Sequence, residues 1–585
     1  MLDAIIRLSV NNKLIVGLFT AALIFAGVYA FVQLPIDAIP DITNNQVQVL
    51  TVSPTLATQE VEQFVTAPIE HAVRSIPGVV ELRSISRFGL SVITVVFEER
   101  INPYLARQLI SEKLKVAEEM IPPGFGTPEM APISTGLGEI LHYRVEPMPG
   151  YENRYTATDL RTIQDWIVKR QLSGIPGVVE INSFGGFLKQ YEVALSPERL
   201  RSFGLGIQEV FQALENANEN TGGAYIEHTN NAYFIRSEGL VQSLDDIRQI
   251  VVRDNAGAPI KIGDIGEARF GHAVRYGAVS HNDEGEIVLG IVMMLKGENA
   301  ARVIRRVKER LEVVKKSLPE GVTVTPFLDR ENLVNRTIAT VRNNLTEGAL
   351  IVIFVLVLLL GNWRAGLIIA SVIPLSMLFA LWMMHLFGVS ANLMSLGAID
   401  FGLIVDGAVI IVEATLHFLA VRVLQKQGEG ATRFTRAEMD ENVSTAAGRV
   451  MRSSVFGIII ILIVYLPILS LSGVEGKMFR PMAQTVSFAL IGALILSLTY
   501  VPAVSALVLS RRIKTAHTFS DRLMEWLKKL YAPSLELALR FPKFIIVSTL
   551  LVFSLSVGLF LRMGGEFIPT LDEGDIMMHG FLRPG

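Results

Sequence analysis

The sequence predicts an α-helical transmembrane bundle that carries α+β, ferredoxin-like subdomains outside the membrane. Half of the 585 residues are hydrophobic and only 19% are charged, which is too apolar for an ordinary soluble chain. Seven apolar runs approach the length that crosses a bilayer. Roughly three hundred residues of mixed, soluble character separate the first run from the second, which leaves room for the outer subdomains.

The seven apolar runs define the spans of the bundle. We place them at residues 14–32, 346–360, 366–387, 392–419, 453–471, 482–509 and 544–561. Spans two to six thus occupy 346–509, and residues 337–345 can extend the short second run as a helix above the membrane. In the loop 510–543, apolar residues recur at helical spacing. This pattern is typical of an amphipathic helix on the cytoplasmic membrane surface, and a helix packed against the bundle fits it equally well.

Basic residues orient the bundle. Arginines and lysines are concentrated in residues 1–13 and in the loops after the second, fourth and sixth spans, whereas Lys477 and Arg480 are the basic residues of the short loops on the opposite side. The positive-inside rule makes the basic side cytoplasmic. We therefore expect a multi-pass protein of the cell inner membrane, with residues 33–345 in the periplasm. A cleavable signal peptide is the alternative for the first span, but its apolar stretch is longer than such peptides have.

The first outer subdomain, residues 33–130, shows the order of a split βαβ fold. Residues 46–52 alternate as a strand, and Thr58 can cap the helix that follows. Strands at 79–86 and 91–97 and a second helix at about 102–119 complete a β-α-β-β-α order. That order is the ferredoxin-like arrangement.

A repeat predicts a second, related subdomain. The sequence IPGVVE at Ile76–Glu81 recurs at Ile175–Glu180, and each copy ends an amphipathic helix and begins a strand. The second subdomain comprises residues 131–190 and 274–330, because residues 191–273 interrupt its pattern. We interpret the interruption as an inserted docking subdomain.

Three carboxylates lie in the otherwise apolar fourth span: Asp400, Asp406 and Glu413. A charged side chain near mid-membrane costs roughly 2.5–3.5 kcal/mol on insertion scales, so such residues persist mainly where they face a polar interior, a partner or an ion path. Asp406 and Glu413 are seven residues apart and share one helix face within about 20°, whereas Asp400 is expected about 120° around the helix from Asp406. Burial disfavours the charged form, which suits reversible protonation.

The same span contains two glycines, Gly402 and Gly407, which are expected to let another helix approach closely. The alternative to a transport role is that the carboxylates hold the bundle together through interhelical hydrogen bonds. That alternative fits Asp400 alone better than it fits three acids in fourteen residues.

Three stretches resemble the resistance–nodulation–division (RND) exporters: Leu34–Asp41 (LPIDAIPD), Thr66–Glu70 (TAPIE) and the acidic fourth span. Asp400–Glu413 (DFGLIVDGAVIIVE) and Ser134–Ile140 (STGLGEI) are similar, more narrowly, to the heavy-metal-efflux branch of cobalt–zinc–cadmium type. The likeness covers the whole chain. Drug-exporting relatives usually carry adjacent aspartates at the centre instead of this spacing of Asp, Asp and Glu.

The resemblance implies a homotrimeric pump in the lipid bilayer of the inner membrane, driven by inward proton flow. It would work with a periplasmic adaptor (membrane fusion) protein and an outer-membrane channel. Asp400, Asp406 and Glu413 match the family's proton-relay acids, and Asp406 is the expected principal carrier. The Gly/Asn-rich residues 221–231 would belong to the docking region that joins neighbouring protomers.

Members of that family are about twice this length and have twelve spans. This chain ends at Gly585, after its seventh span, and Gly564–Asp572 echoes Leu34–Asp41, as expected where a second repeat begins. We therefore interpret residues 562–585 as the start of a second periplasmic region and the chain as an N-terminal half. A truncated fragment that does not transport without its C-terminal half is an alternative.

The cargo implied by the resemblance is a divalent heavy-metal cation, namely zinc, cobalt, cadmium or nickel. Cysteine is absent, so metal ligands would be His, Met, carboxylate, backbone oxygen or water. In copper and silver exporters of the family, a Met is expected shortly after the seventh span. Here that region contains Met577, Met578 and His579, and imidazole suits zinc, cobalt or nickel. Organic compounds are the alternative cargo.

Enzymatic motifs are missing from the sequence. We find no phosphate-binding Gly loop, no HExxH and no nucleophile elbow. We therefore predict a secondary active transporter rather than an enzyme, with no resident cofactor. The net charge of −3 argues neither for nor against nucleic acid, and no nucleic-acid partner is predicted.

Overall fold

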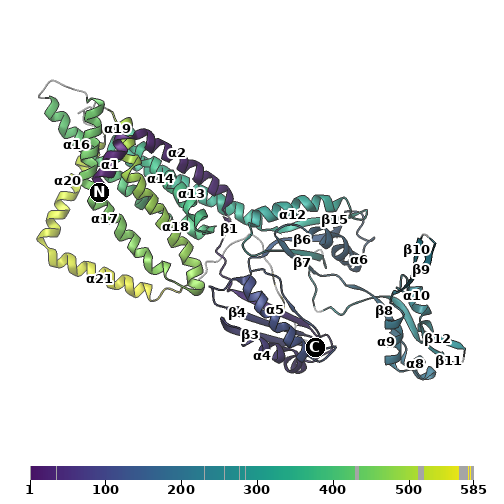
Figure 1. The fold of residues 1–585 in the computed structure, drawn as a ribbon. Coiled ribbons are helices and arrows are strands. Elements are labelled where there is room, and N and C mark those ends of the chain that lie inside the picture. The colour runs from purple at the N-terminus through teal and green to yellow at the C-terminus, as the bar shows by residue number, and fades with distance from the viewer. Residues whose placement is uncertain are drawn as a thin grey trace. The chain divides into compact units, whose positions relative to one another are not determined.

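The computed structural model describes residues 2–34, 36–37, 39–229, 231–255, 257–275, 277–282, 285–427, 434–510, 519–565, 578 and 580. It divides into two compact units (Figure 1). The first unit comprises residues 1–137, 297–301 and 330–585, and the second comprises 138–296 and 302–329.

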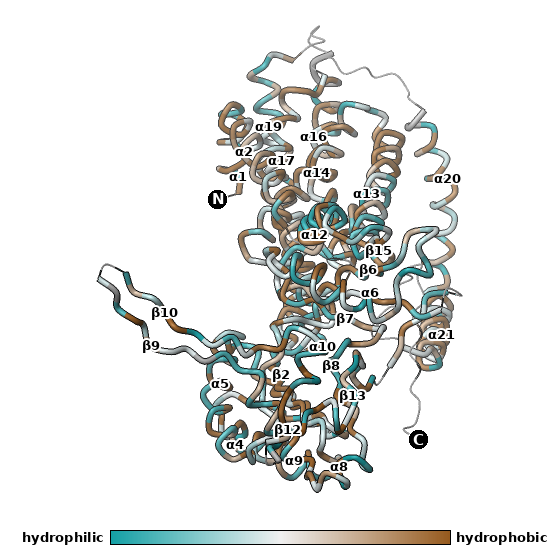
Figure 2. The backbone as a smooth tube through the Cα atoms, turned by 90° about the vertical axis from the view of Figure 1, so that its right-hand side faces the viewer, coloured by the Kyte–Doolittle hydropathy of each residue, from teal (hydrophilic) through white to brown (hydrophobic). Residues whose placement is uncertain are grey.

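Seven helical segments of the described chain are long and apolar enough to cross a membrane. They are α2 (Lys13–Gln33), α13 (Arg330–Leu360), α14 (Trp363–Leu386), the segment Leu393–Val423 formed by α15 (Leu393–Gly397) and α16 (Phe401–Gln427), α17 (Arg436–Leu469), α18 (Gly473–Leu498) and α21 (Pro542–Phe560). Each coincides with one of the predicted apolar runs, and the helices appear as mainly hydrophobic tubes in Figure 2. The chain is a multi-pass membrane protein.

The structure divides one of the predicted runs, confirms and lengthens the extension of the second span, and adds a helix before the first span. The sixth run is two helices, because α18 ends at Leu498 and α19 (Tyr500–Val508) follows Thr499. Pro502 lies in the first turn of α19, and a proline lacks the N–H that would continue the preceding helix. The second span begins earlier, since α13 is helical from Arg330 and includes the predicted extension 337–345. Residues 1–13 contain a further helix, α1 (Leu2–Asn11).

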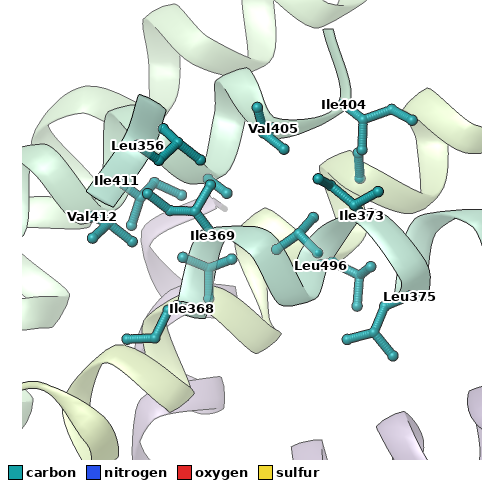
Figure 3. Close-up of a cluster of buried hydrophobic side chains, with 14 of the residues drawn as sticks. Leu356, Ile368, Ile369, Ile373, Leu375, Ile404, Val405, Ile411, Val412 and Leu496 are labelled. Atoms are coloured by element: carbon teal, nitrogen blue, oxygen red, sulfur yellow. The ribbon is translucent and has the colours of Figure 1, made fainter. Parts of the chain in front are cut away.

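Helix α14 lies at the centre of the bundle and packs against α2, α13, α16 and α18. Its core side chains meet those of α16, as Figure 3 shows for Ile369 and Ile373 beside Ile411 and Ile404. By contrast, none of the described side chains of α20 (Phe519–Arg540) is buried. The predicted helix in the loop 510–543 therefore exists; it contacts α13, but none of its described side chains is buried there.

The first outer subdomain is a four-stranded antiparallel sheet in the order β3-β4-β2-β5. The strands are β2 (Gln46–Val52), β3 (Val79–Arg87), β4 (Leu90–Phe97) and β5 (Pro128–Met130). A helix over Thr58–Val73, comprising α3 (Thr58–Val61), a π-helical turn at Glu62–Thr66 and α4 (Ala67–Val73), packs with α5 (Pro103–Met120) on a shared core that includes Val65, Ile93 and Ile110.

The second unit has a sheet with the strand order β15-β6-β14-β7, which is the same topology. In both sheets the first and third strands along the chain lie at the centre, and the second and fourth lie at the edges. The strands of the second unit are β6 (Glu139–Pro147), β7 (Val178–Phe184), β14 (Val288–Met294) and β15 (Val322–Asp329). Its helices cover Ala157–Leu172, beginning with α6 (Ala157–Ile163) and ending with α7 (Lys169–Leu172), and α12 (Ala300–Lys315).

The IPGVVE repeat has one structure in both copies. Each copy ends a helix and begins an equivalent strand, β3 or β7. Gly78 and Gly177 both have positive φ, 81° and 93°, in the turn between helix and strand. Only glycine adopts this backbone conformation without strain, which explains why both copies carry it.

The residues inserted between β7 and β14 form a body with its own small core, centred on Ile262, Ile265 and Val210. The body is joined to the rest of the unit through the antiparallel pair β8 (Lys189–Leu195) and β13 (Gly266–His272). Its Gly/Asn-rich segment forms a hairpin of β9 (Thr221–His228) and β10 (Asn231–Ser237), the narrow two-stranded extension in Figure 2.

Candidate functional site

Helix α16 has one buried face and one open face. The buried face carries apolar residues that belong to the core of the bundle, including Ile404, Val405, Ile411 and Val412 (Figure 3). It packs against α13, α14, α17, α18 and α19. The open face carries Asp406, Ile410 and Glu413, which are all exposed in the described chain.

The predicted alignment of Asp406 and Glu413 therefore holds in the structure. Both lie within one continuous helix, where seven residues bring a side chain back to within about 20° of its starting direction. They are about 10.5 Å apart along the helix axis, at 1.5 Å per residue. Two acids thus stand two turns apart on a face that the other described helices leave uncovered.

Asp400 lies in the fourth span but outside helix α16. Helix α16 begins at Phe401, so Asp400 precedes the helix and has no position on its stripe. One carboxylate oxygen, Oδ1, accepts a hydrogen bond from the N–H of Gly402 at 2.8 Å, as an N-terminal capping side chain does. The expectation that Asp400 lies off the stripe of Asp406 and Glu413 therefore agrees with the structure, because Asp400 caps the helix from outside it.

The two glycines of α16 also differ from each other. A Cβ at Gly407 would lie 2.9 Å from Ser497 Oγ of α18 and 3.3 Å from Ile458 Cδ1 of α17, so this glycine does permit close helix contact. A Cβ at Gly402 would meet only the side chain of Asp400, at 3.1 Å. The prediction is confirmed for Gly407 and is wrong for Gly402.

Sequence reasoning missed His417. This residue follows Glu413 by one turn and Asp406 by three turns, and it is exposed on the same open face. Helical spacing could have identified it, because His417 follows Asp406 by eleven residues. Eleven residues return a side chain to nearly the same helix face, as seven residues do.

Several contacts fix the outer end of the bundle. Strand β1 (Ile36–Asp37), which follows α2, pairs in parallel with β16 (Ala391–Asn392), which leads into α15 and α16. At the start of α18, Lys477 Nζ donates to the carbonyl of Thr43 at 2.6 Å and pairs with Glu99 at 2.7 Å. One of the two basic residues predicted on the outer side thus contacts the first outer subdomain.

The predicted metal ligands remain untested. Met577 and His579 lie outside the described residues, and Met578 is 93% exposed. Within the described ranges, no group of three or more His, Cys, Asp or Glu side chains is arranged to hold a metal ion. Among the outer histidines, His142 is buried, and its Nε2 lies 3.4 Å from Glu139 Oε2.

A bundle of bilayer-length helices that carries α/β subdomains, with two acids on the open face of α16, defines the class of polytopic membrane proteins. Comparison with known proteins gives the particular family. The sequence profile of the AcrB/AcrD/AcrF family matches residues 5–585. The chain belongs to this family.

Two relatives indicate to which branch of the family the chain is similar. The chain is 46% identical over 589 residues to the cobalt-zinc-cadmium resistance protein CzcA of Cupriavidus metallidurans, covering all of this chain and 55% of that protein. It is 40% identical to the nickel-cobalt-cadmium resistance protein NccA of Alcaligenes xylosoxydans xylosoxydans, covering all of this chain and 56% of the relative. The resemblance to the heavy-metal-efflux branch is thereby confirmed.

A solved structure agrees with this assignment. A crystal structure of a heavy metal efflux pump superposes with a TM-score of 0.80 at 33% sequence identity, covering 97% of this chain and 52% of that one. The chain spans about half the length of the relatives that it matches.

Proposed function

We propose that this chain forms the N-terminal half of a proton-driven exporter of divalent heavy-metal cations. The observation that carries the proposal is the open face of α16, where Asp406 and Glu413 lie on a largely apolar, bilayer-length helix. Each charged side chain at this depth costs roughly 2.5–3.5 kcal/mol, so a purely structural helix gains nothing by carrying two.

The open face also bears on how the acids work. Because the chain spans about half of its relatives' length, we propose that helices of the other half cover this face in the complete protein. Acids at such an interface, reached by water, alternate between a protonated and a charged form. Asp406 is the principal proton carrier in this scheme, and Glu413 is the second.

Asp400 has a different proposed role. It lies one turn and a half before Asp406 and caps the start of α16. We assign it to the outer mouth of the proton pathway, where it accepts protons and passes them inward. Its bond to Gly402 holds one carboxylate oxygen and leaves the other oxygen available for a proton.

The wider architecture follows from the same assignment. We propose an inner-membrane homotrimer whose outer units are periplasmic and ferredoxin-like, with residues 191–273 as a docking subdomain whose β9–β10 hairpin contacts the neighbouring protomer. A periplasmic adaptor and an outer-membrane channel complete the path. The strand orders β3-β4-β2-β5 and β15-β6-β14-β7 support the ferredoxin-like assignment.

The proposed cargo is zinc, cobalt, cadmium or nickel. Two observations support this choice: the printed names of CzcA and NccA, and the absence of cysteine, which removes the soft thiolate ligands. Met577, Met578 and His579 are proposed to contact the ion as it passes.

Growth of metal-sensitive cells tests the proposal. Cells that express the full-length exporter should resist at least one of zinc, cobalt, cadmium and nickel, and Asp406→Asn should abolish that resistance at normal membrane abundance. Glu118→Gln, which removes an exposed carboxylate of α5, is the matched control and should leave resistance intact. Resistance that survives in Asp406→Asn cells would contradict the assigned role. If the exporter conferred resistance to organic compounds and to none of these metals, the proposed metal cargo would be wrong.

A further inference from the structure

We propose that His417 is the last protein group of the proton pathway on the cytoplasmic side, taking protons from Glu413 and releasing them to water. The inference rests on the proposed function, since it extends the same path along α16. The carboxylic acid of Glu413 gives its proton to an imidazole nitrogen, and the imidazolium then gives that proton to cytoplasmic water. The transfer needs no other reactant.

The first observation is the alignment of the three titratable side chains. Relative to Asp406, Glu413 is rotated by about −20° and His417 by about +20°, so all three point within a narrow sector of the helix surface. His417 lies about 6 Å beyond Glu413 along the axis, a separation that one water molecule bridges.

The second observation is the burial pattern. Every residue of this stripe from Asp406 to His417, at positions 406, 410, 413 and 417, is exposed, whereas Ile411, Val412 and Thr415 between them are buried. His417 therefore shares the environment of the acids rather than that of the core. A histidine that served only for packing would belong on the buried face.

The third observation is the charge around this end of α16. Arg422 of the same helix and Arg449 of α17 both lie over the ring of Phe418, with Cζ at 5.5 Å and 5.1 Å from its centroid. Guanidinium groups remain charged at all physiological pH values and mark the water-facing end of the span. His417 is thus the titratable group between Glu413 and the aqueous boundary.

Of the helices packed against α16, α17 brings the most charge to this end: besides Arg449, it carries Arg436, Glu438, Asp440, Glu441 and Arg452. Glu438 accepts a hydrogen bond from the N–H of Thr435 and so caps α17, and Asp440 pairs with Lys13 at 2.6 Å.

The remaining helices bring few charges to this end. Arg364, at the start of α14, donates to the carbonyl of Val508 at the end of α19 at 3.4 Å. The charged residues of α18 all lie in its first turns, at the opposite end, and those of α13 all precede Gly348. No carboxylate among the described residues of α14, α18 or α19 lies at the cytoplasmic end beside His417, so proton transfer from Glu413 has no competing acceptor on these helices.

Imidazole suits this position. It is the side chain that ordinarily gains and loses a proton between about pH 5 and 8, so it exchanges protons with cytoplasmic water in both directions. A second carboxylate there would hold a proton less readily near neutral pH.

The test uses the full-length exporter in proteoliposomes with zinc as cargo and a pH-sensitive dye to follow proton flux. His417→Gln should slow zinc-dependent proton flux about tenfold and flatten its dependence on the pH of the cytoplasmic side, because general acid–base groups contribute at least that much. His417→Glu should restore part of the flux, with its pH dependence moved to lower pH. His385→Gln is the matched control; this histidine of α14 packs edge-on against Tyr29 and should behave as wild type.

The outcomes separate the inference from the proposed function. Wild-type flux and pH profile in His417→Gln would overturn the role of His417 while leaving the exporter intact. Equal loss in His417→Gln and His417→Glu, at normal abundance, would also overturn it, because a steric role would then suffice. A wild-type protein that couples no protons to zinc would instead contradict the proposed function itself.

Discussion

Arg330 and Asp37 join two distant parts of the chain at the outer end of the bundle. Arg330 donates to one oxygen of Asp37, Oδ1, from Nη2 at 3.0 Å and from Nε at 3.3 Å. Its remaining nitrogen, Nη1, donates to the carbonyl of Leu137 at 2.7 Å. Asp37 lies opposite Asn392 in the parallel pair of β1 and β16. The start of α13 is thus linked to the segment that leads into the acidic helix.

Breaking the link between Arg330 and Asp37 should lower the stability of the protein. Arg330→Ala should lower the free energy of unfolding by about 2 kcal/mol, because hydrogen bonds to charged groups contribute about 1.5–3 kcal/mol and both side chains are largely shielded from water. Thermal unfolding of the purified protein in detergent measures the change. Adding Asp37→Ala should cost little more, since the partners form one unit.

The control for this link is Arg83→Ala, which removes an exposed ion pair with Glu81 and should change stability by less than about 1 kcal/mol. Equal effects of Arg330→Ala and Arg83→Ala would mean that the Arg330 contacts do not stabilise the bundle.

Gly407 predicts a steric effect inside the membrane. Gly407→Val should lower stability by about 1–3 kcal/mol, because its side chain has no room beside Ser497 and Ile458. The measurement is again thermal unfolding in detergent. Gly457→Val on α17 is the matched control, because a Cβ there meets nothing within 4 Å. Should Gly457→Val prove as damaging as Gly407→Val, valine itself and not the helix contact would be the cause.

The turn of the IPGVVE repeat predicts a backbone effect. Gly78→Ala should destabilise the first outer subdomain by about 1–2 kcal/mol for the positive φ alone, and by more because the new Cβ would collide with Ile101. Chemical denaturation followed by circular dichroism measures the loss. Gly136→Ala, at a glycine with open space and no left-handed backbone, should be neutral. A neutral Gly78→Ala would show that the turn relaxes around alanine.

Much of the fold could be predicted from the sequence, because its signals are local. Apolar runs located the bilayer-length helices, and alternation with capping residues located the strands and helices of the outer subdomains. The IPGVVE repeat predicted two related units, since its glycine is required by a helix-to-strand turn. The stripe of Asp406 and Glu413 followed from helical periodicity alone.

The features that could not be predicted depend on contacts between distant residues or on single residues that start or end a helix within an apolar run. Arg330 and Asp37 are 293 positions apart in the sequence, and no pattern in either segment predicts that they pair. Asp400 was given an angle of about 120° from Asp406 on the same helix, but its side chain accepts a hydrogen bond from the N–H of Gly402, and the helix starts after it. Pro502 divides the sixth run, although hydropathy is uninterrupted there.

The central claim is that Asp406 carries protons across the membrane in exchange for metal. Its most direct test is zinc-dependent proton flux in proteoliposomes that contain the full-length exporter, compared between wild type, Asp406→Asn and Glu118→Gln. We predict that wild type and Glu118→Gln move protons when zinc is supplied and that Asp406→Asn moves none, although it is present in equal amount. Zinc-dependent proton flux at the wild-type rate in Asp406→Asn would contradict the account.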